Sequence, residues 1–169
     1  MTVEPAAPRR HDWDLGAYQA RARAACFICG IVAGPLAADH HVVHRDGVGV
    51  VFLARYPVAW GQVLVAPVEH REQAVGDFTE DEYLALQRLV RRVSRAVEAA
   101  VPGERLYVLS LGSQAANAHV HWHLIRLPAG VPYPAQQAEM LTADKGWLEF
   151  DDGDLAALAA ELAGALGTA

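Results

Sequence analysis

Apolar residues recur along the chain in short runs and in longer periodic stretches, and these two patterns predict strands and helices respectively. Short runs rich in valine, leucine and aromatic residues, bounded by turn-forming residues, predict five strands. They lie at residues 40–45, 47–55, 62–67, 105–112 and 118–127. Asp46 and Gly47 separate the first two runs and are typical of a hairpin turn.

The helical period is clearest over residues 79–101. Thr79 and Glu82 have the spacing of a capping box, and acidic residues fill the first turn. The apolar positions of this segment repeat on one face, and they are Leu84, Leu86, Leu89, Val90, Val93 and Val97. Shorter helices are predicted at residues 14–25, where Asp14 is the expected N-cap, and at the Ala/Leu-rich residues 151–166.

The order of these elements, β-β-β-α-β-β, predicts an α+β domain with an antiparallel sheet of about five strands and one main helix. The remaining segments carry weaker patterns. Residues 1–13 predict a flexible arm, residues 129–137 an irregular linker, and residues 138–150 match neither helix nor strand. A chain of 169 residues is long enough for one ordinary domain, so we expect a single domain over residues 1–169.

Composition narrows the class of protein. Apolar residues make up 53% of the chain, which favours a globular protein over a disordered one. The formal net charge of -6 argues against a large nucleic-acid-binding surface. No apolar stretch reaches the length of a membrane span, and the N-terminus lacks the apolar segment of a secretory signal. We therefore expect a soluble, cytoplasmic protein that binds neither membranes nor nucleic acids.

Three histidines at alternate positions carry the clearest chemical signal. In "NAHVHWHLIRLP", residues 117–128, His119, His121 and His123 share one face of the predicted strand, and apolar residues occupy the other. Neutral imidazoles gain little by packing together, and charged ones repel, so the cluster predicts a functional site. Two interpretations remain open. Either the histidines bind a catalytic Zn²⁺, or a neutral histidine attacks phosphorus while its neighbour protonates the leaving group.

The two cysteines, Cys26 and Cys29, form a C-x-x-C motif. In a reducing compartment this spacing favours a metal site or a redox pair over a structural disulfide. No βαβ pattern of the thioredoxin type surrounds the motif, so we favour a metal site.

Three segments together resemble the histidine triad (HIT) family of nucleotide hydrolases and transferases. The segment "HVHWHLI" is similar to the family's triad signature, and "CFICGIVAG" is similar to the opening of its bacterial, zinc-containing branch. The segment "YPVAWGQVLVAPVEH" resembles the family pattern P-x-x-P-G-H-x-L-V-x-P-x-x-H. The three segments span residues 26–128, the expected HIT core, and leave residues 129–169 as a C-terminal extension. The resemblance implies a homodimer of α+β subunits whose sheets join.

The resemblance also implies roles for the histidines. The enzyme would act at the α-phosphate of a nucleotide substrate, with His121 as the nucleophile. His123 would contact the phosphate and help the bond to the leaving group break, and the backbone at His119 would orient the His121 ring. One structural zinc per chain is implied as well, with no organic cofactor, and its ligands would be Cys26, Cys29, His70 and His119.

The chain departs from the family pattern in the loop before the triad. The segment "SLGSQAANAH" is shorter than its family counterpart, and Ser110 stands where the family has asparagine. Gln114 and Asn117 are the remaining polar candidates for binding the substrate phosphate, and Asn117 shares the expected strand face of His119. Elsewhere, Gln62 replaces a family histidine.

We therefore expect a nucleotide hydrolase of the histidine triad type. It would cleave nucleoside phosphoramidates or dinucleoside polyphosphates through a covalent nucleotidyl-histidine intermediate. The altered loop motivates a second hypothesis, a zinc-stabilised nucleotide-binding protein with little turnover, because lost phosphate ligands weaken stabilisation of the transition state. A nucleotidyltransferase or phosphorylase of the same family is a further alternative. A His₃ metallohydrolase is disfavoured, because the cysteines offer a better metal site.

Overall fold

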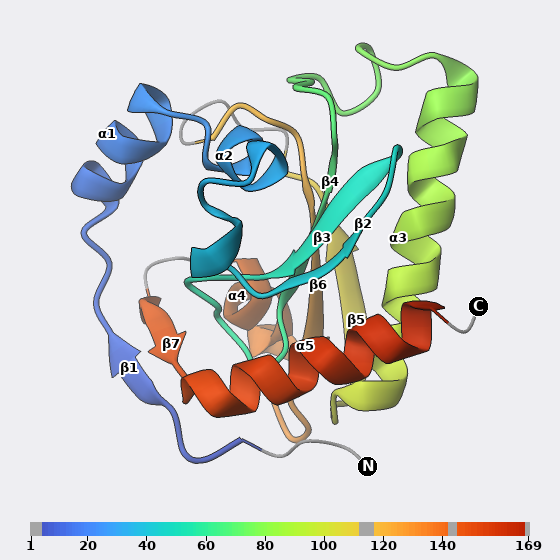
Figure 1. Cartoon of the computed structure of the whole chain (residues 1–169). Coiled ribbons are helices and arrows are strands. Elements are labelled where there is room, and N and C mark those ends of the chain that lie inside the picture. The colour runs from blue at the N-terminus through green and yellow to red at the C-terminus, as the bar shows by residue number, and fades with distance from the viewer. Residues whose placement is uncertain (1–4, 112–116, 142–144, 168–169) are drawn as a thin grey trace.

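The structure, a computed structural model, describes residues 5–111, 117–141 and 145–167. Its centre is an antiparallel sheet of five strands in the order β2-β3-β4-β6-β5 (Figure 1). These strands are β2 (Val42–Arg45), β3 (Gly49–Leu53), β4 (Val63–Pro67), β5 (Arg105–Leu109) and β6 (Trp122–Leu127). The α+β class and the five-stranded antiparallel sheet predicted from the sequence are confirmed.

Helices surround this sheet (Figure 1). In the described part of the chain they are α1 (Leu15–Ala24), α2 (Phe27–Ala33), the 3-10 helix η1 (Ala37–Asp39), α3 (Glu80–Ala100), α4 (Tyr133–Leu141) and α5 (Asp152–Gly167). Helices α3 and α5 pack on one face of the sheet, where Val51 and Val65 are buried with them. Helix α2 packs on the other face, where Phe52 and Leu64 are buried. Because both faces are covered, every residue of β3 and β4 is buried.

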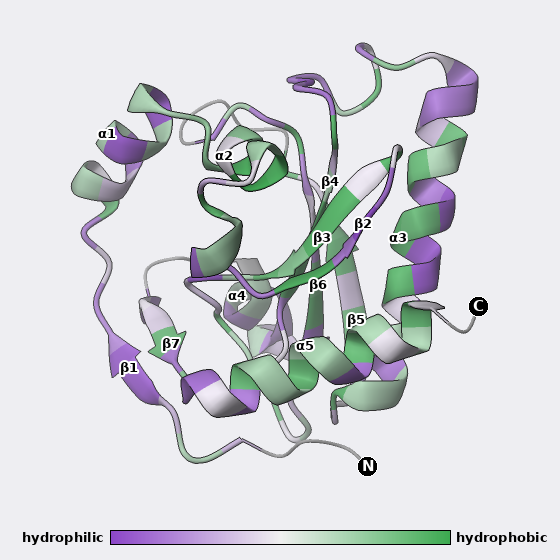
Figure 2. Cartoon of the chain, viewed as in Figure 1, coloured by the Kyte–Doolittle hydropathy of each residue, from purple (hydrophilic) through white to green (hydrophobic). Residues whose placement is uncertain are grey.

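The main helix, α3, forms as its sequence predicts. The Thr79 side chain accepts from the Glu82 amide, and the Glu82 carboxylate accepts from the Thr79 amide, which completes the capping box. Its apolar stripe faces the sheet and its charged residues face outward (Figure 2). Leu84, which the periodicity placed in the stripe, is the exception, because it is 41% exposed near the start of the helix.

Helix α2 was not predicted from the sequence. It has only seven residues and begins directly after Cys26, whose sulfur accepts from the Cys29 amide as an N-cap. Ile28 and Ile31 are fully or almost fully buried against the sheet, so tertiary packing stabilises a helix too short to form alone. The cap places both cysteine sulfurs at the positive end of the helix dipole.

A strand near the N-terminus pairs with a strand that lies just before α5. Strand β1 (Arg9–His11) forms a two-stranded antiparallel sheet with β7 (Trp147–Glu149). The flexible arm expected at residues 1–13 therefore needs correction, since its residues 9–11 are a strand. The reason is a partner distant in sequence: Arg9 also donates to the carboxylate of Glu149 (2.9 Å).

Helix α4 begins inside the irregular linker expected at residues 129–137 and continues into residues 138–141, for which the sequence predicted neither helix nor strand. Pro134 occupies its first turn, where the missing amide hydrogen removes no helical hydrogen bond. Met140 packs with Ile125 and Leu127 of β6, and this contact with the sheet explains why the segment is helical.

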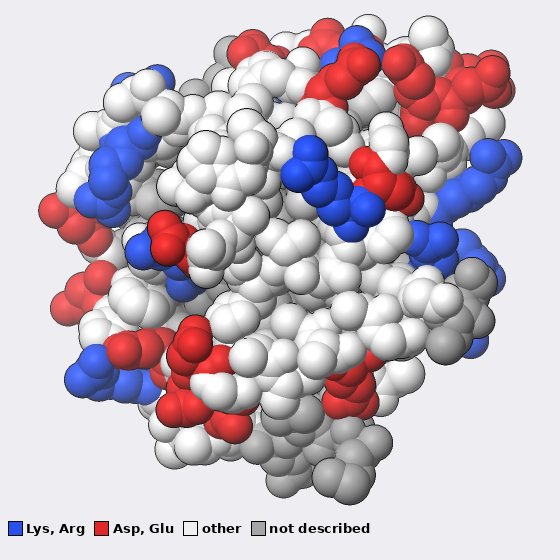
Figure 3. Space-filling view, viewed as in Figure 1, with Lys and Arg blue, Asp and Glu red and all other residues white. Residues whose placement is uncertain are grey.

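Charged side chains of both signs are scattered over the face of the molecule drawn in Figure 3. None of the described helices is long and apolar enough to cross a lipid bilayer.

Candidate active site and metal centre

The segment that carries the histidine triad is a strand only in part. Strand β6 begins at Trp122, so His119 and His121 precede it, which corrects the strand predicted from residue 118. The cause is a change of hydrogen-bond partner. The Val120 amide donates to the carbonyl of Arg71 (2.7 Å), outside the ladder between β4 and β6.

The three imidazoles consequently separate into two groups. The rings of His121 and His123 lie together, with centroids 4.8 Å apart. The ring of His119 is fully buried and instead packs against His70, with centroids 4.7 Å apart. Trp122 lies in the apolar core with α3 and α5. The expected single face of three histidines is therefore a pair, with the first histidine assigned to a different cluster.

The backbone of His119 fixes the proton of His121. The Nδ1–H of His121 donates to the carbonyl of His119 (2.8 Å), so the neutral ring carries its lone pair on Nε2. Burial lowers the pKa of His121, and the hydrogen bond to this carbonyl opposes the shift only in part. Within the described residues, Nε2 has no hydrogen-bond partner. A neutral imidazole with a free Nε2 has the form that a nucleophile requires.

Gln62 fixes the proton of His123 in the opposite sense. The Val58 amide donates to Gln62 Oε1 (2.8 Å), which turns the amide nitrogen of Gln62 toward His123. Gln62 Nε2 then donates to His123 Nδ1 (3.0 Å), so neutral His123 carries its proton on Nε2. Burial and the neighbouring His121 lower the pKa of His123 to about 3. His123 is thus a neutral hydrogen-bond donor beside His121.

A glycine places Gln62 for this role. Gly61 has a φ of +66°, and a Cβ at this position would lie 2.5 Å from a methyl group of Val101. Only glycine combines this backbone conformation with such a close approach. Gln62 itself is 6% exposed, which makes its two hydrogen bonds the main way of satisfying its amide.

A cavity of about 490 Å³ opens beside the histidine pair. His121, His123 and Gln62 line it, together with the predicted substrate ligands Ser110 and Asn117. Ser110 Oγ and Asn117 Nδ2 are buried and have no hydrogen-bond partner among the described residues. Unsatisfied polar atoms of this kind mark places where a ligand completes the hydrogen bonding. The third predicted substrate ligand, Gln114, lies outside the described residues.

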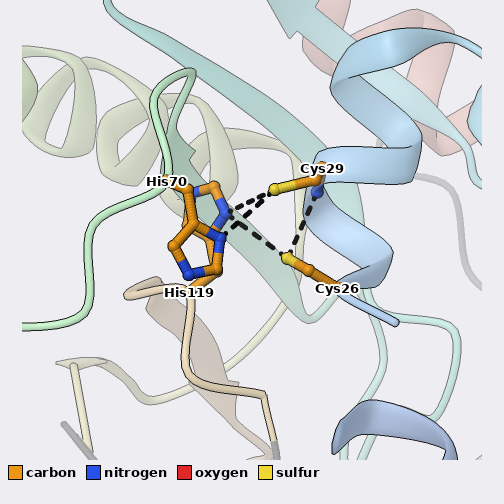
Figure 4. A group of neighbouring side chains, drawn as sticks. All are labelled: Cys26, Cys29, His70 and His119. Atoms are coloured by element: carbon orange, nitrogen blue, oxygen red, sulfur yellow. Dashed lines mark hydrogen bonds between the residues drawn. The ribbon is translucent and has the colours of Figure 1, made fainter. Parts of the chain in front are cut away.

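The cysteines meet two histidines on the far side of His119. One potential ligand atom from each of four side chains lies within 4.8 Å of all the others, and the residues are Cys26, Cys29, His70 and His119 (Figure 4). They come from the start of α2, the loop after β4 and the segment before β6. The resemblance to the histidine triad family implied this same set of four residues.

The geometry of this cluster fits a tetrahedral zinc ion. The Nδ1 atom of His119 lies 3.5 Å from each cysteine sulfur, and the Nδ1 atom of His70 lies 3.3 Å from the Cys29 sulfur. Ordinary Zn–S and Zn–N bonds at a tetrahedral angle place sulfur and nitrogen about 3.6 Å apart. A Cys₂His₂ set leaves no open coordination position for substrate, which is typical of a structural site and not of a catalytic one.

Groups around the cluster prepare these side chains for a metal. The Nε2–H of His119 donates to the carbonyl of Pro67 (3.0 Å), and His70 Nε2 lies 3.3 Å from a Glu72 carboxylate oxygen. Both contacts leave the Nδ1 atoms as ligands. Burial, followed by the neighbouring Cys26, raises the pKa of the Cys29 thiol to about 11. Two thiolates this close need a cation between them, and a bound metal deprotonates such thiols. The four side chains fit one structural zinc.

Comparisons with known proteins agree with this geometry. No family model matches the sequence. An uncharacterised HIT-like protein of Saccharolobus solfataricus is 32% identical over 104 residues, which cover 59% of this chain and 72% of that protein. The chain belongs to the histidine triad family. Its fold is shared with solved HIT structures that are less similar in sequence.

Two of those structures illustrate the shared HIT fold. A hypothetical histidine triad nucleotide-binding protein from Sulfolobus tokodaii has a TM-score of 0.68 and 24% identity, over 85% of this chain and 93% of its own. A zinc-bound histidine triad protein from Mycobacterium smegmatis has a TM-score of 0.64 and 19% identity, over 86% of this chain and 95% of its own.

Several residues of this HIT site escaped the sequence analysis. Gln62 was noted only as a replaced histidine, yet it determines the tautomer of His123. Trp13, Tyr18 and Tyr56 line the cavity as well, although two of them lie before the segment that resembles the family. A tryptophan next to a helix start, in a segment rich in proline and arginine, was the only available signal.

Proposed function

We propose that this protein is a nucleotide hydrolase of the histidine triad type. It cleaves at the α-phosphate of nucleoside phosphoramidates or dinucleoside polyphosphates, and it proceeds through a covalent intermediate on His121. One observation carries the proposal. The hydrogen bond from His121 Nδ1 to the His119 carbonyl leaves the lone pair of Nε2 beside a cavity that also holds unsatisfied polar atoms.

In the first step, Nε2 of His121 attacks the α-phosphorus, and the bond from phosphorus to the leaving group breaks. The ring becomes positively charged, and the His119 carbonyl stabilises this charge by accepting from Nδ1–H. His123 donates its Nε2–H toward the phosphate. A bound phosphate raises the pKa of His123, since an opposite charge favours the protonated ring. The ring then takes a second proton from solvent and passes its Nε2 proton to the leaving group, which returns His123 to the neutral form.

In the second step, water attacks the phosphorus of nucleotidyl-His121. The P–N bond breaks, a nucleoside monophosphate is released, and the electron pair returns to Nε2. The proton from water goes to His123 or to solvent, which restores the starting state. Ser110 and Asn117 supply hydrogen bonds to the phosphoryl oxygens in both steps, because both residues line the cavity and Ser110 Oγ and Asn117 Nδ2 have no hydrogen-bond partner among the described residues.

Intact-mass spectrometry tests the intermediate. The protein is mixed briefly with an adenosine phosphoramidate and quenched at alkaline pH, where phosphohistidine survives. We expect an increase in mass equal to one nucleotidyl group, and none with His121→Ala. Full turnover by His121→Ala would refute the mechanism. Failure of the wild-type protein to form either adduct or product with phosphoramidates and dinucleoside polyphosphates would leave a nucleotide-binding protein. Phosphate in place of water as the acceptor would identify a phosphorylase.

We also propose one structural zinc per chain at Cys26, Cys29, His70 and His119. When bound, the ion joins the start of α2 to the loop after β4 and to the segment before β6. Reduced thiols are needed at this site, which fits a cytoplasmic protein. Metal analysis of protein purified without added metal should give about one zinc per chain, and a content far below one would contradict the proposal.

We further propose that the chain forms a homodimer through β5. This strand lies at the edge of the sheet and exposes backbone hydrogen-bonding groups, and its Val108 is 46% exposed. Leu111, just after it, is 62% exposed. Analytical ultracentrifugation should show a dimer that Val108→Lys converts to a monomer. A monomeric wild-type protein at micromolar concentration would refute this assembly.

The domain organisation follows from the same arrangement. We propose that residues 26–128 form the catalytic core of a single domain and that residues 129–169 complete it. Helix α5 is part of the main apolar core, where Leu158 and Leu162 are fully buried. Truncation before α5 should therefore yield insoluble or unfolded protein.

A further inference from the structure

The N-terminal segment brings aromatic side chains to the catalytic cavity. Trp13 directly precedes α1, and Tyr18 lies within it. Both line the cavity that holds His121, and so does Tyr56 from the loop after β3. The ring centroids of Trp13 lie 4.9 Å from Tyr18 and 5.3 Å from Tyr56. We call these three residues the arm cluster.

Contacts with the paired strands β1 and β7 hold the arm cluster in place. Tyr56 contacts Trp147 of β7, with ring centroids 5.1 Å apart. Trp147 in turn stacks on His11 of β1 at 4.5 Å. His11 and Trp147 also face each other in the pairing of β1 with β7, so the segment that carries Trp13 is anchored two residues before it.

Core packing does not explain helix α1. None of its residues is buried, and Leu15 is 44% exposed. In Figure 1 the helix lies to one side of the sheet and is joined to it through β1 and α2. A helix that buries no side chain contributes little to the core. The role that the structure leaves for α1 is to form part of the cavity wall.

The indole nitrogen of Trp13 is unpaired within the part of the chain that the structure describes. Trp13 Nε1 is buried and has no hydrogen-bond partner among the described residues. A buried indole N–H usually donates to some acceptor, and its desolvation is costly when it does not. Since Trp13 lines the cavity, a ligand with an acceptor atom would satisfy this donor.

A second aromatic cluster lines the same cavity. It consists of Phe27, His40 and Phe52, whose ring centroids lie between 5.9 Å and 6.2 Å from one another. All three belong to the core that resembles the family, whereas Trp13 and Tyr18 precede that core. The part of the substrate common to family members is the nucleotide, so the arm cluster is free to contact the part that varies.

Positive charge accompanies the arm cluster. Arg21 of α1 lines the cavity, and basic side chains are visible over α1 in Figure 3. Arg55 lines the cavity too and lies over the Tyr56 ring, with its guanidinium carbon 5.9 Å from the centroid. Cations here suit a substrate whose phosphate lies between two planar groups.

We propose that Trp13, Tyr18 and Tyr56 form the leaving-group subsite and select leaving groups that contain a planar aromatic ring with a hydrogen-bond acceptor. The proposal rests on the proposed function, because it assigns the nucleotide to the core and the leaving group to the arm cluster. The rings of the arm cluster pack against the planar ring of the leaving group, and Trp13 Nε1–H donates to its acceptor atom.

Binding to a protein that cannot turn over tests this proposal. The full-length, zinc-loaded His121→Ala protein is titrated by calorimetry with three adenosine phosphoramidates, whose amines carry a pyridylmethyl, a benzyl or a cyclohexylmethyl group. These groups have similar size, but only the first two are planar and only the first has an acceptor. We expect the benzyl compound to bind about 10-fold more tightly than the cyclohexylmethyl compound, from ring packing. The pyridylmethyl compound should gain roughly a further 5-fold from one hydrogen bond.

Two substitutions of Trp13 separate these effects. In the same background, Trp13→Ala should remove the preference for planar groups while the affinity for the cyclohexylmethyl compound stays within about twofold. Trp13→Phe should remove only the advantage of pyridylmethyl over benzyl, because it keeps a ring and loses the N–H. Tyr133→Ala is the matched control, since Tyr133 is 82% exposed and is not among the residues that line the cavity.

The possible failures are distinguishable. A preference for planar groups that survives Trp13→Ala, or equal affinity for all three compounds, overturns the leaving-group subsite while the wild-type protein still forms the His121 adduct. If His121→Ala binds none of the compounds and the wild type forms no adduct, the proposed function fails together with the subsite.

Discussion

Gln62→Glu should reverse the proton on His123 with almost no change in shape. In the native protein Gln62 receives the Val58 amide on Oε1 and donates Nε2–H to His123 Nδ1. A glutamate still accepts from Val58, but its second oxygen can only accept. His123 must then donate from Nδ1 and present an unprotonated Nε2 to the substrate phosphate.

The size of the effect follows from the bond that is lost. Removing one donor that stabilises developing charge typically lowers kcat by about 100-fold to 1,000-fold. The fold should survive, because both hydrogen bonds of residue 62 are retained with one of them reversed. Gln62→Leu differs in this respect. It leaves the Val58 amide and His123 Nδ1 buried without partners, which costs about 1–3 kcal/mol for each group.

The pH profile distinguishes a reversed tautomer from simple damage. The carboxylate of Glu at position 62 raises the pKa of His123, since the opposite charge favours the protonated ring. A protonated ring donates from both nitrogens, so the activity of Gln62→Glu should increase as pH falls, a trend that Gln62→Leu cannot show.

The assay is kcat/KM for an adenosine phosphoramidate between pH 5 and pH 8, with thermal unfolding of each variant as the check on folding. Gln136→Glu is the matched control. Gln136 is also a buried glutamine; its Nε2–H donates to the Val131 carbonyl and not to His123. A Gln62→Glu protein with kcat/KM within threefold of wild type across this range would refute the assignment of the His123 proton.

Three further predictions concern stability. Chelation of zinc should lower the free energy of unfolding by about 4 kcal/mol relative to protein held at a free zinc concentration about 1,000 times Kd. In thermal melts, Cys29→Ser should be unstable from the outset and insensitive to the chelator. Equal chelator sensitivity of the wild-type and Cys29→Ser proteins would refute the zinc cluster. For Asp46, burial opposes ionisation, but hydrogen bonds from His44, Gly49 and Val48 outweigh it and lower the carboxyl pKa. The stability that Asp46 contributes is therefore present above the unfolded pKa of about 3.9 and lost as pH falls through the folded pKa. Asp46→Asn should narrow the difference in urea midpoint between pH 7 and pH 3. Parallel pH profiles of the wild type and the variant would contradict this. Thr79→Ala removes the side-chain cap of α3 and should cost about 1 kcal/mol in urea unfolding at pH 7, with a loss below 0.3 kcal/mol counting against the cap.

Local sequence patterns predicted the central sheet and α3 because the interactions that form them are encoded within each segment. Strands β3 and β4 are buried on both faces, so their sequences are continuous apolar runs. Helix α3 carries its own capping box at Thr79 and its own apolar stripe. By contrast, β1 and β7 have three residues each and are held by pairs such as Arg9 and Glu149, which are 140 positions apart. No local period reveals a partner at that distance.

The candidate site likewise has parts that sequence patterns predicted and parts that they did not. Cys26 and Cys29 form a local motif, and the resemblance to the family supplied His70 and His119 correctly. The expected alternation of three histidines on one strand failed because the segment before Trp122 makes hydrogen bonds outside the β4–β6 ladder, from the Val120 amide to the Arg71 carbonyl and from His119 Nε2–H to the Pro67 carbonyl. The three histidines of the triad pattern therefore do not share one face, because His119 joins the metal cluster while His121 and His123 form a pair.

His119 belongs both to the metal cluster and to the proposed catalytic site, and this explains how a structural metal site and the His121–His123 pair come to share one short segment. Its ring faces the cysteines and is fixed by Pro67, while its carbonyl accepts from His121 Nδ1. Whatever holds the ring in place also holds the carbonyl, and the carbonyl determines which nitrogen of His121 is free to attack. A substitution of His119 must therefore disturb the metal site and the nucleophile together. His70 lies on the exposed side of the metal site and packs against the His119 ring, but it does not contact His121 in the described structure, so its substitution should affect metal binding more than the orientation of the proposed nucleophile.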